Sequence, residues 1–318
     1  MLEYYKVSKD GIIEGTQNDY DWLNIYNPTD AEVNLVASRT SMTADDVGLI
    51  LSNSQSNRIE GLAEPDIPLT LILQYPVKLN SSLGGMIEFD TNPIIAILTN
   101  GDDSNDLITI SRNEPQFIDM IKSEDDVLRK DIESKKDVLL LVIYYLSSAF
   151  NDILSDLKYE ATKIEESLKK STDNQTLYQI MAEQKTIASF VGSISNNKSI
   201  CDKIISDTNY FGNEEYTELA RVASVELNDA YALATQLDYL LDKYAGLSAS
   251  IVGNNQAESI NKLTIYTIVL SVIATICGLL GINYPIPGEN IPVMFYVALG
   301  IMIAVGVVVG TVLKHVLK

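Results

Sequence analysis

The sequence predicts an α/β domain, then a long helix, and finally two helices that cross a membrane. Three observations support this fold class. Short β-prone runs fill the first third of the chain, an apolar heptad pattern follows later, and the last 56 residues hold two long apolar spans. We therefore divide the chain into a cytosolic α/β domain (1–120), a cytosolic helical pair (121–212), a stalk helix (213–262) and a transmembrane hairpin (263–318).

The first domain alternates β-prone runs with turn signals. We expect strands at Leu69–Tyr75, Met86–Phe89, Pro93–Thr99 and Leu107–Ile110. The signals that separate them are Gly84-Gly85, Asn92-Pro93 and the acidic turn Asn100–Asp106. Helices are expected at Thr29–Ser38, which Asn27-Pro28-Thr29 introduces, and at Thr43–Leu51.

The helical pair begins with a capping signal at Ser123, which acidic residues follow. We expect its first helix to run from there to about Lys170. The apolar block Val138–Leu146 is too short to cross a bilayer, so it belongs to a core. A second helix starts near Thr172-Asp173 and reaches Asp207, with Asn196-Asn197 as a point where it can break or kink.

The stalk helix carries the most regular pattern in the sequence. Ten positions at alternating spacings of four and three form a heptad seam, and only Glu226 among them is charged. A helix from Asn213 to Asn283 would be roughly 105 Å long. It therefore needs neighbouring subunits, or else it packs against the two preceding helices of its own chain. The seam positions are Leu219, Ala223, Glu226, Ala230, Leu233, Leu237, Leu240, Tyr244, Leu247 and Ile251.

The apolar spans Leu263–Asn283 and Val293–Leu313 are each long enough to cross the bilayer as a helix. The loop 284–292 between them contains Glu289 and no Lys or Arg. Met1–Asp10 does not have the pattern of a signal peptide, and Lys262, Lys314, His315 and Lys318 flank the spans. We expect a multi-pass protein of the cell membrane with both termini in the cytoplasm and the loop outside. Cys201 and Cys277 then lie in different environments, so we expect no disulfide.

The composition limits which partners the protein can bind and which chemistry it can perform. Residues 1–262 hold 21 of the 23 basic residues and 42 of the 43 acidic ones, which gives a net charge of about −21. Such a surface disfavours nucleic acid and anionic lipid headgroups as partners; it suits cations, or it only keeps the domain soluble. The sole histidine is His315, and the sequence has no phosphate loop and no zinc-ligand spacing. We therefore expect no enzyme.

The first apolar span carries a stripe of hydroxyl groups. Thr264, Thr267, Ser271 and Thr275 recur at spacings of three and four, which places them on one face of a helix. Such hydroxyls can bond back to their own helix or join helices together. They can also line a water-filled path, which would require several copies of the helix around an axis.

The segment 254–287, NNQAESINKLTIYTIVLSVIATICGLLGINYPIP, closely resembles the CorA family of divalent-cation transporters. In that family a Gly-Met-Asn signature ends the first membrane helix, and Gly281-Ile282-Asn283 stands there in this chain. The resemblance extends more weakly to Trp22 with Asn27-Pro28-Thr29, to Arg58–Glu60 and to Leu240–Tyr244.

This resemblance implies a funnel-shaped homopentamer that transports magnesium. By analogy Gly281, Ile282 and Asn283 form the external selectivity ring, Thr264, Thr267 and Ser271 line the pore, and Ile260 lies at the gate. Asn283 would meet the ion through its hydration shell, because Mg²⁺ loses water reluctantly. Magnesium could also regulate the pore at carboxylates between subunits, with Glu214, Glu215, Glu218 and Asp45-Asp46 as candidates.

Two alternatives remain open from the sequence. Ile282 replaces the usual Met of the signature, so zinc, cobalt or nickel could be the transported ion of the same fold. The heptad seam also suits a structural or signalling coiled-coil protein that the hairpin merely anchors in the bilayer.

Overall fold

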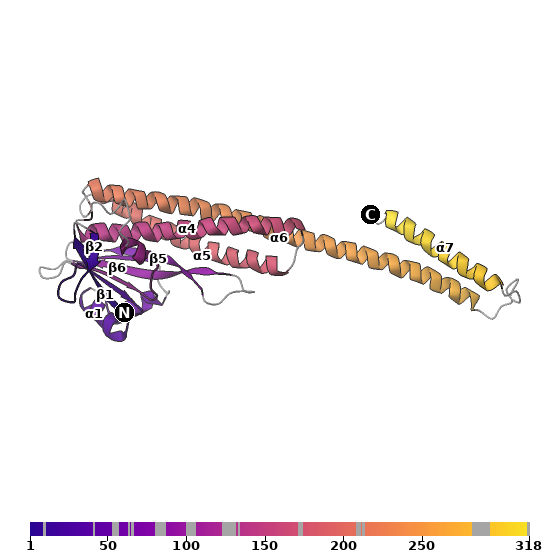
Figure 1. Ribbon diagram of the computed structural model, residues 1–318, viewed down its shortest axis with the longest axis horizontal. Coiled ribbons are helices and arrows are strands. Elements are labelled where there is room, and N and C mark those ends of the chain that lie inside the picture. Colours follow the sequence, from indigo (N-terminus) through magenta and orange to yellow (C-terminus); the bar gives the residue numbers. More distant parts are fainter. Residues whose placement is uncertain are drawn as a thin grey trace. The chain divides into compact units, whose positions relative to one another are not determined.

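The computed structural model describes residues 1–8, 11–40, 42–52, 57–62, 64, 67–79, 87–99, 106–122, 132, 134–170, 174–207, 211, 214–281 and 293–316. Two compact units can be separated, Met1–Ala245 and Gly246–Lys318. The first unit contains a mixed β-sheet with helices on both faces (Figure 1). The second contains the end of one long helix and a further helix. An N-terminal α/β domain, a long helix and a C-terminal helix are thus confirmed.

Seven strands form one sheet in the order β2-β1-β3-β7-β6-β5-β4. Only β3 and β7 pair in parallel among the described strands; the other neighbours are antiparallel. The parallel pair therefore brings the carboxyl ends of β3 and β7 to the same edge. The strands are β1 Leu2–Ser8, β2 Gly11–Glu14, β3 Trp22–Tyr26, β4 Arg58–Glu60, β5 Leu69–Lys78, β6 Phe89–Leu98 and β7 Leu107–Ser111.

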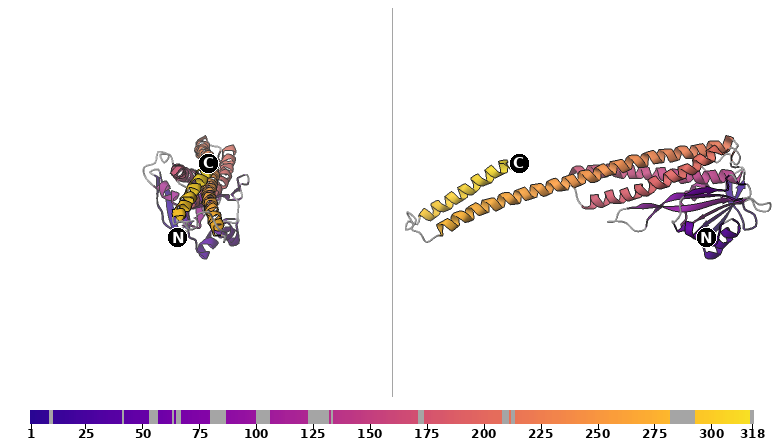
Figure 2. Two further views of the ribbon diagram at one scale, coloured as in Figure 1. Left: turned by 90° about the vertical axis from the view of Figure 1, so that its right-hand side faces the viewer. Right: turned by 180° about the vertical axis from the view of Figure 1, so that it is seen from behind.

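Two short helices cover one face of the sheet, α1 (Asp30–Ser38) and α2 (Ala44–Leu51). Both begin where the sequence predicts, because each N-cap threonine forms a capping box: Thr29 with Glu32, and Thr43 with Asp46. The opposite face carries α3 (Phe117–Lys122), α4 (Lys135–Lys170), α5 (Asn174–Ser206) and the first part of α6 (Glu214–Leu280), as Figure 2 shows. The unit is thus a three-layer sandwich.

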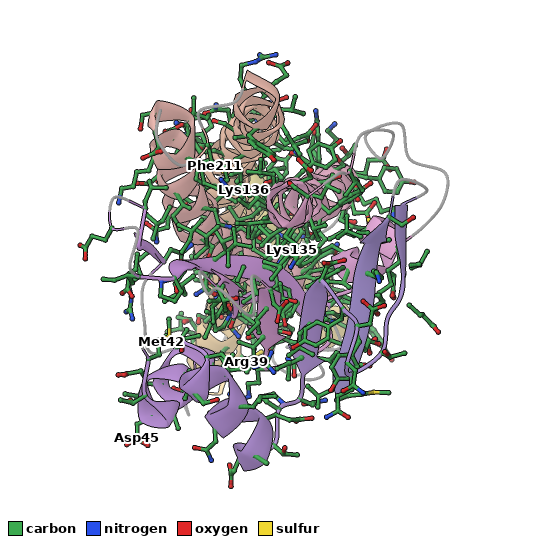
Figure 3. All side chains as sticks on the ribbon, turned by 90° about the vertical axis from the view of Figure 1, so that its left-hand side faces the viewer. Arg39, Met42, Asp45, Lys135, Lys136 and Phe211 are labelled. Carbon is green, nitrogen blue, oxygen red and sulfur yellow. The ribbon has the colours of Figure 1, made fainter. Side chains whose placement is uncertain are left out.

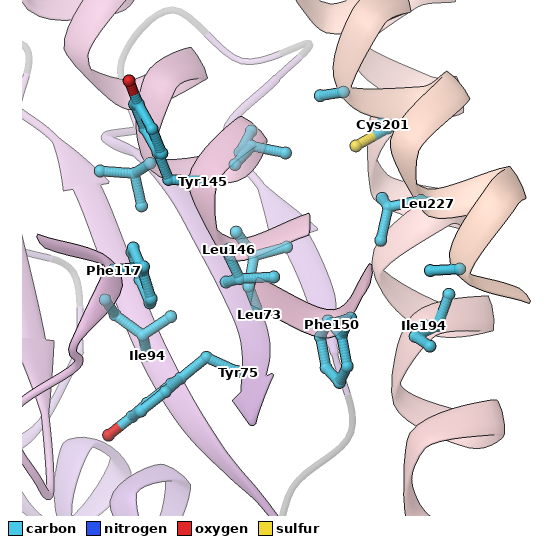
Figure 4. Close-up of a cluster of buried hydrophobic side chains, with 14 of the residues drawn as sticks. Leu73, Tyr75, Ile94, Phe117, Tyr145, Leu146, Phe150, Ile194, Cys201 and Leu227 are labelled. Carbon is cyan, nitrogen blue, oxygen red and sulfur yellow. The ribbon is translucent and has the colours of Figure 1, made fainter. Parts of the chain in front are cut away.

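The larger core lies between the sheet and the helical layer (Figure 4). Leu73, Tyr75 and Ile94 project from the strands toward Phe117 of α3 and Leu146 of α4. The apolar block of α4 is buried here, as its length predicts. The core continues into the bundle of α4, α5 and α6, where the rings of Phe150 and Phe190 meet edge to face with centroids 5.0 Å apart.

Charged groups join the helical layer to the opposite layer at one edge of the sheet. Lys135 Nζ lies 3.4 Å from Asp21 and 3.6 Å from Asp106, at the start of α4. Arg39, which follows α1, lies 3.4 Å from the other oxygen of Asp106. Figure 3 labels Arg39 and Lys135, which approach the sheet from its two sides. Two carboxylates and two cations thus meet here across the sheet.

Strand β6 corrects one sequence prediction. Asn92-Pro93 is not a turn but lies within the strand, opposite Tyr75 and Gln74 of β5. The backbone of Gln74 points away from β6, because its N–H and C=O bond to the side chain of Asn197. Pro93 lies opposite Gln74, so its nitrogen also points away from β5. On that side β7 does not pair with Pro93, because the pairing of β6 with β7 begins only at Ile94. No ladder bond is lost, and the proline is tolerated.

The start of α4 corrects a second prediction. Ile132 is not helical, so no single helix runs from Ser123 to Lys170, and residues 123–131 lie outside the described part. The helix begins at Lys135 instead. Ser134 caps it, because its hydroxyl oxygen accepts from the N–H of Asp137 at 3.3 Å. In return its N–H and hydroxyl donate to Asp137 Oδ2, at 2.7 and 2.8 Å. The predicted Gly84-Gly85 and Asn100–Asp106 turns also fall mostly on residues outside the described part.

Helix α5 crosses Asn196-Asn197 without a break. Asn197 is fully buried and uses its side chain to continue the sheet: Oδ1 accepts from Gln74 N at 3.0 Å, and Nδ2 donates to Gln74 O at 2.7 Å. Strand β4 ends its pairing with β5 at Ile72. The amide of Asn197 thus pairs with the buried N–H and C=O of Gln74, which β4 does not reach.

Helix α6 extends without interruption past Gly246 and Gly253, as predicted. Its buried seam, however, differs from the predicted one in every second position. Ala223, Ala230, Leu237 and Tyr244 are buried as expected, but Glu226 and Leu247 are not. The reason is that α6 packs against α4 and α5 of its own chain as far as Tyr244. Packing against these two preceding helices was the alternative to packing against neighbouring subunits. The remaining buried positions are Ala220, Ser224, Leu227, Ala234, Leu241 and Ser248.

Candidate functional site

The hydroxyl stripe lies on the last part of α6. Thr267, Ser271 and Thr275 each donate a hydrogen bond to the carbonyl four residues earlier, at 2.9, 2.8 and 2.8 Å. The back-bonding explanation is therefore confirmed for these three groups. Their oxygen lone pairs remain available on the same exposed face. Each hydroxyl thus offers acceptors, and not donors, to whatever lies beside the helix.

A different side of α6 packs against α7 (Val293–Val316). A Cβ atom added to Gly306 would lie 3.3 Å from Ile273 Cδ1, and one added to Gly310 would lie 3.5 Å from Val269. The small residues thus let the two helices approach closely, as the Gly-xxx-Gly spacing indicates. Cys277 Sγ also lies 3.4 Å from Met302 Sδ of α7. Both cysteines of the chain are free thiols.

The hydroxyl stripe extends through Ile260, which lies one turn before Thr264 and is 62% exposed. From Ile260 to Gly278 this face spans about 80° of the helix circumference and carries no charged side chain. The nearest charges, Glu258 and Lys262, pair with each other at 2.7 Å on another side of the helix. An uncharged, hydroxyl-bearing face therefore runs along most of the apolar span.

The signature at the end of the span is only partly described. Gly281 forms the first turn after α6, and its N–H donates to Cys277 O at 3.0 Å. Ile282 and Asn283 lie outside the described residues, so their predicted role in a selectivity ring stays a prediction.

The candidate regulatory carboxylates do not come together within this chain. Glu218 pairs with Arg221 on its own helix at 2.5 Å, and this ion pair holds the pKa of Glu218 below its usual range. Asp46 serves the capping box of α2. The side chains of Glu214 and Glu215 lie outside the description. No group of three or more His, Cys, Asp or Glu side chains that could hold a metal occurs among the described residues.

A buried carboxyl in the helical bundle escaped the sequence analysis. Glu183 of α5 is 4% exposed, and its Oε2 has no hydrogen-bond partner in the described part of the chain. Its Oε1 accepts from Gln179 Nε2 at 3.5 Å. Burial, together with the nearby charge of Glu160, raises the pKa of Glu183 to about 8. Its position between Ile180 and Ile187 on the apolar face of α5 was the available signal.

Among the described residues, three helices are long and apolar enough to cross a membrane: parts of α4, α6 and α7. The apolar window of α4 is 61% buried by the rest of the chain, whereas the windows of α6 and α7 are 0% and 6% buried. The apolar residues of α4 therefore belong to the core. Those of α6 and α7 face outward and require another apolar environment.

The sequence matches the family model described as "CorA-like Mg2+ transporter protein" over residues 17–315. No curated protein matches. Among solved structures, the complete CorA magnesium transporter from Methanocaldococcus jannaschii superposes with a TM-score of 0.76 at 17% identity, covering 99% of this chain and 96% of that one. The full-length CmaX protein gives a TM-score of 0.73 at 15% identity, with 98% of each chain covered.

Proposed function

Because this chain belongs to the CorA-like Mg²⁺ transporter family, we propose that it forms a homopentameric pore through which Mg²⁺ crosses the cell membrane. The family consists of membrane transporters of divalent cations and not of enzymes. For this chain we propose four further points: that the ion is Mg²⁺, that the oligomer is a pentamer, that the ion passes along α6, and that internal Mg²⁺ controls the pore.

The hydroxyl face of α6 carries the proposal. Because the protons of Thr267, Ser271 and Thr275 are held by the helix's own carbonyls, their oxygens can accept hydrogen bonds from the water shell of a cation. The face holds no carboxylate that would bind the ion too tightly to release it. Hydrated Mg²⁺ suits such a surface, since it gives up water reluctantly.

One such face cannot enclose a path, so several copies of α6 must surround an axis. Five copies are proposed from the family resemblance. In this arrangement α7 lies outside α6, both termini are cytoplasmic, and Gly281, Ile282 and Asn283 line the external mouth. The neutral amide of Asn283 would bind the hydration shell of the entering ion.

The decisive experiment is cation uptake into liposomes that contain the reconstituted protein. Asn283→Ala should reduce Mg²⁺ flux at least about tenfold, which corresponds to about 1.4 kcal/mol of lost stabilisation. Asn254→Ala, which removes an amide from an exposed position on the same helix, should leave flux unchanged. Native mass measurement should give a pentamer for both variants. Normal flux through Asn283→Ala would exclude the proposed mouth.

A second pair of variants tests the hydroxyl face. Thr267→Val keeps the shape of the side chain but removes the acceptor, so it should slow Mg²⁺ uptake. Thr311→Val is the matched control, because Thr311 of α7 makes the same bond to a carbonyl four residues back, at 2.9 Å, but lies on the outer helix. Equal flux through the two variants would contradict a path along α6.

Zinc remains the alternative cargo, because Ile282 replaces the Met of the signature. Parallel uptake of zinc, cobalt and nickel, with and without a proton gradient, distinguishes these ions and the mode of transport. We also propose that internal Mg²⁺ holds neighbouring subunits together through carboxylates, with Glu214, Glu215 and Glu218 as candidates. Loss of the ion would let the subunits separate and the pore open.

A further inference from the structure

Helices α6 and α7 run side by side in opposite directions within the unit Gly246–Lys318 (Figure 1 and Figure 2). Their register is fixed by three neighbouring pairs, because each step of four residues along α6 is matched by four residues back along α7. The pairs are Cys277 with Met302, Ile273 with Gly306 and Val269 with Gly310. The same register therefore predicts which residues meet where the two apolar spans end, beyond Gly310.

Three polar side chains lie at this end of the helix pair. Lys314 of α7 follows Gly310 by four residues, which brings it level with position 265 of α6. At a rise of about 1.5 Å per residue, Tyr266 lies about 1.5 Å from that level along the helix axis, and Lys262 lies about 4.5 Å from it on the other side. Two ammonium groups and one phenol thus lie at nearly the same depth.

The three side chains also lie on the facing sides of the two helices. Lys262 and Tyr266 each precede by seven residues one of the α6 residues that pack against α7, so each lies within about 20° of that residue around the helix. Lys314 lies about 40° from Gly310, which packs against α6. We call Lys262, Tyr266 and Lys314 the Lys–Tyr–Lys cluster.

The positive charge of this cluster is only partly balanced. Glu258 pairs with Lys262 at 2.7 Å. Lys314 is exposed and forms no ion pair or hydrogen bond with another residue in the described part of the chain. Its place in the last turn of α7 complements the helix dipole, but that explains the charge of Lys314 and not the side on which it lies. Two cations held at one depth repel each other, so an anion between them would stabilise this end of the pair.

Exposed apolar side chains continue from the cluster along both helices. Leu263 and Leu270 of α6, and Val308 and Val312 of α7, are each more than half exposed. Tyrosine and lysine are typical of the boundary between hydrocarbon and water, because each has an apolar body and a polar tip. Basic pockets between transmembrane helices are known to bind lipid headgroups. The cluster therefore suits an anion that carries acyl chains better than it suits a free anion.

We propose that the Lys–Tyr–Lys cluster binds the headgroup of an anionic phospholipid, an inference that rests on the proposed place of α6 and α7 in the bilayer. The phosphate accepts hydrogen bonds from the ammonium groups of Lys262 and Lys314 and from the hydroxyl of Tyr266. The acyl chains lie along the exposed apolar flanks of the two helices. A zwitterionic lipid fits less well, because its own ammonium group would lie beside the two lysines. In a chain with a net charge of −20, this local group of cations lets an anionic headgroup approach.

The test is native mass spectrometry of the full-length protein in mild detergent, titrated with phosphatidylglycerol or with phosphatidylcholine. Phosphatidylglycerol should bind at least about tenfold more tightly than phosphatidylcholine. Lys262→Gln and Lys314→Gln should each weaken the binding of phosphatidylglycerol about fivefold, and Tyr266→Phe about threefold. The binding of phosphatidylcholine should change by less than about twofold in these variants. Glycerol phosphate at about 10 mM should not displace the lipid, because it has the same phosphate without acyl chains.

Two control variants separate a site from general attraction to a positive surface. Lys314→Gln combined with His315→Lys keeps the number of lysines but moves the charge about 100° around α7, so it should bind phosphatidylglycerol as weakly as Lys314→Gln alone. Lys243→Gln removes an exposed lysine of α6 outside the cluster and should bind the lipid as the unaltered chain does. Recovery of binding by His315→Lys, an equal loss in Lys243→Gln, equal binding of the two lipids, or displacement by glycerol phosphate would overturn the proposal. These outcomes would leave the transport proposal standing, whereas failure of both lipids to bind would contradict both.

Discussion

Replacement of Glu183 by glutamine should make the unit Met1–Ala245 more stable, and the gain should grow as the pH rises. Glu183 is buried in the bundle of α4, α5 and α6, where one of its oxygens has no hydrogen-bond partner among the described residues. Burial raises its pKa to about 8, so the folded protein holds the carboxyl protonated at neutral pH. The unfolded chain does not, since its glutamate titrates near 4.5.

The size of the effect follows from proton linkage. Below the unfolded pKa both states are protonated, and Glu183 costs nothing by ionisation. Between pH 4.5 and about 8 only the folded state binds the proton, so stability falls by about 1.4 kcal/mol per pH unit. At pH 7 the accumulated loss is about 3 kcal/mol, and above pH 8 it changes no further. Glutamine has the same shape without the proton, so Glu183→Gln removes this loss.

Trp22 provides the assay, because it is the only tryptophan and is fully buried in the sheet. Its fluorescence reports melting of the full-length protein in detergent from pH 4.5 to 8.5. Relative to the unaltered chain, Glu183→Gln should melt at a similar temperature near pH 4.5. It should melt roughly 6–12 °C higher at pH 7, since 1 kcal/mol shifts a domain of this size by about 2–4 °C.

Glu166→Gln is the matched control, because Glu166 is an exposed glutamate of the neighbouring α4. Its melting curve should follow that of the unaltered chain at every pH. A temperature difference between Glu183→Gln and the unaltered chain that stays constant with pH would refute the reasoning. It would mean that Glu183 is ionised or reached by water in the folded state.

Two further outcomes are expected. Asn197→Ala should destabilise the same unit by about 2–5 kcal/mol in the same melting assay, because it leaves the buried N–H and C=O of Gln74 unpaired. Asn196→Ala changes an exposed neighbour and should cost little, and equal losses would contradict the role of Asn197. Millimolar Mg²⁺ should protect the N-terminal unit of the full-length protein from protease more than sodium at equal ionic strength, because specific binding saturates whereas screening does not. Equal protection would argue against the proposed regulation by internal cation.

The sequence predicts the elements of this fold where local chemistry decides them. The capping boxes at Thr29 and Thr43 set the starts of α1 and α2, and both helices begin as expected. The predicted turn at Asn92-Pro93 was wrong, because a proline interrupts a strand only where its nitrogen faces a neighbouring strand. That direction is set by strand pairing, which a local pattern does not contain.

The predicted seam of α6 shows a related limit. A heptad pattern gives the apolar side of a helix but not the width of the surface that its partners cover. Here α4 and α5 bury one row of the predicted seam and a second row beside it, so Glu226 lies at the margin. There its carboxylate accepts a hydrogen bond from Asn151 of α4 at 2.6 Å. Glu226, the one charged residue in the predicted seam, thus lies at the edge of the contact between α6 and α4.

Asn197 and Glu183 could not be assigned roles from the sequence for the same reason. Asn197 lies 123 residues from the strand that it completes, and nothing near it in the chain indicates that partner. Glu183 lies on the apolar face of α5, where the polar neighbours of its carboxyl among the described residues are Gln179 and Glu160. Polar residues at helical core positions were a signal, but their hydrogen bonds depend on tertiary contacts that periodicity does not reveal.

The two interpretations of the hydroxyl stripe, which the sequence left open, are compatible with each other. A hydroxyl that donates to its own helix is no longer free to rotate its proton toward a neighbour. Its oxygen then presents acceptors outward, which favours a cation's water shell over an anion without any fixed charge. The back-bonds would therefore not compete with conduction. They would orient the hydroxyl dipoles with oxygen outward, so that an uncharged face of α6 favours a hydrated cation over an anion.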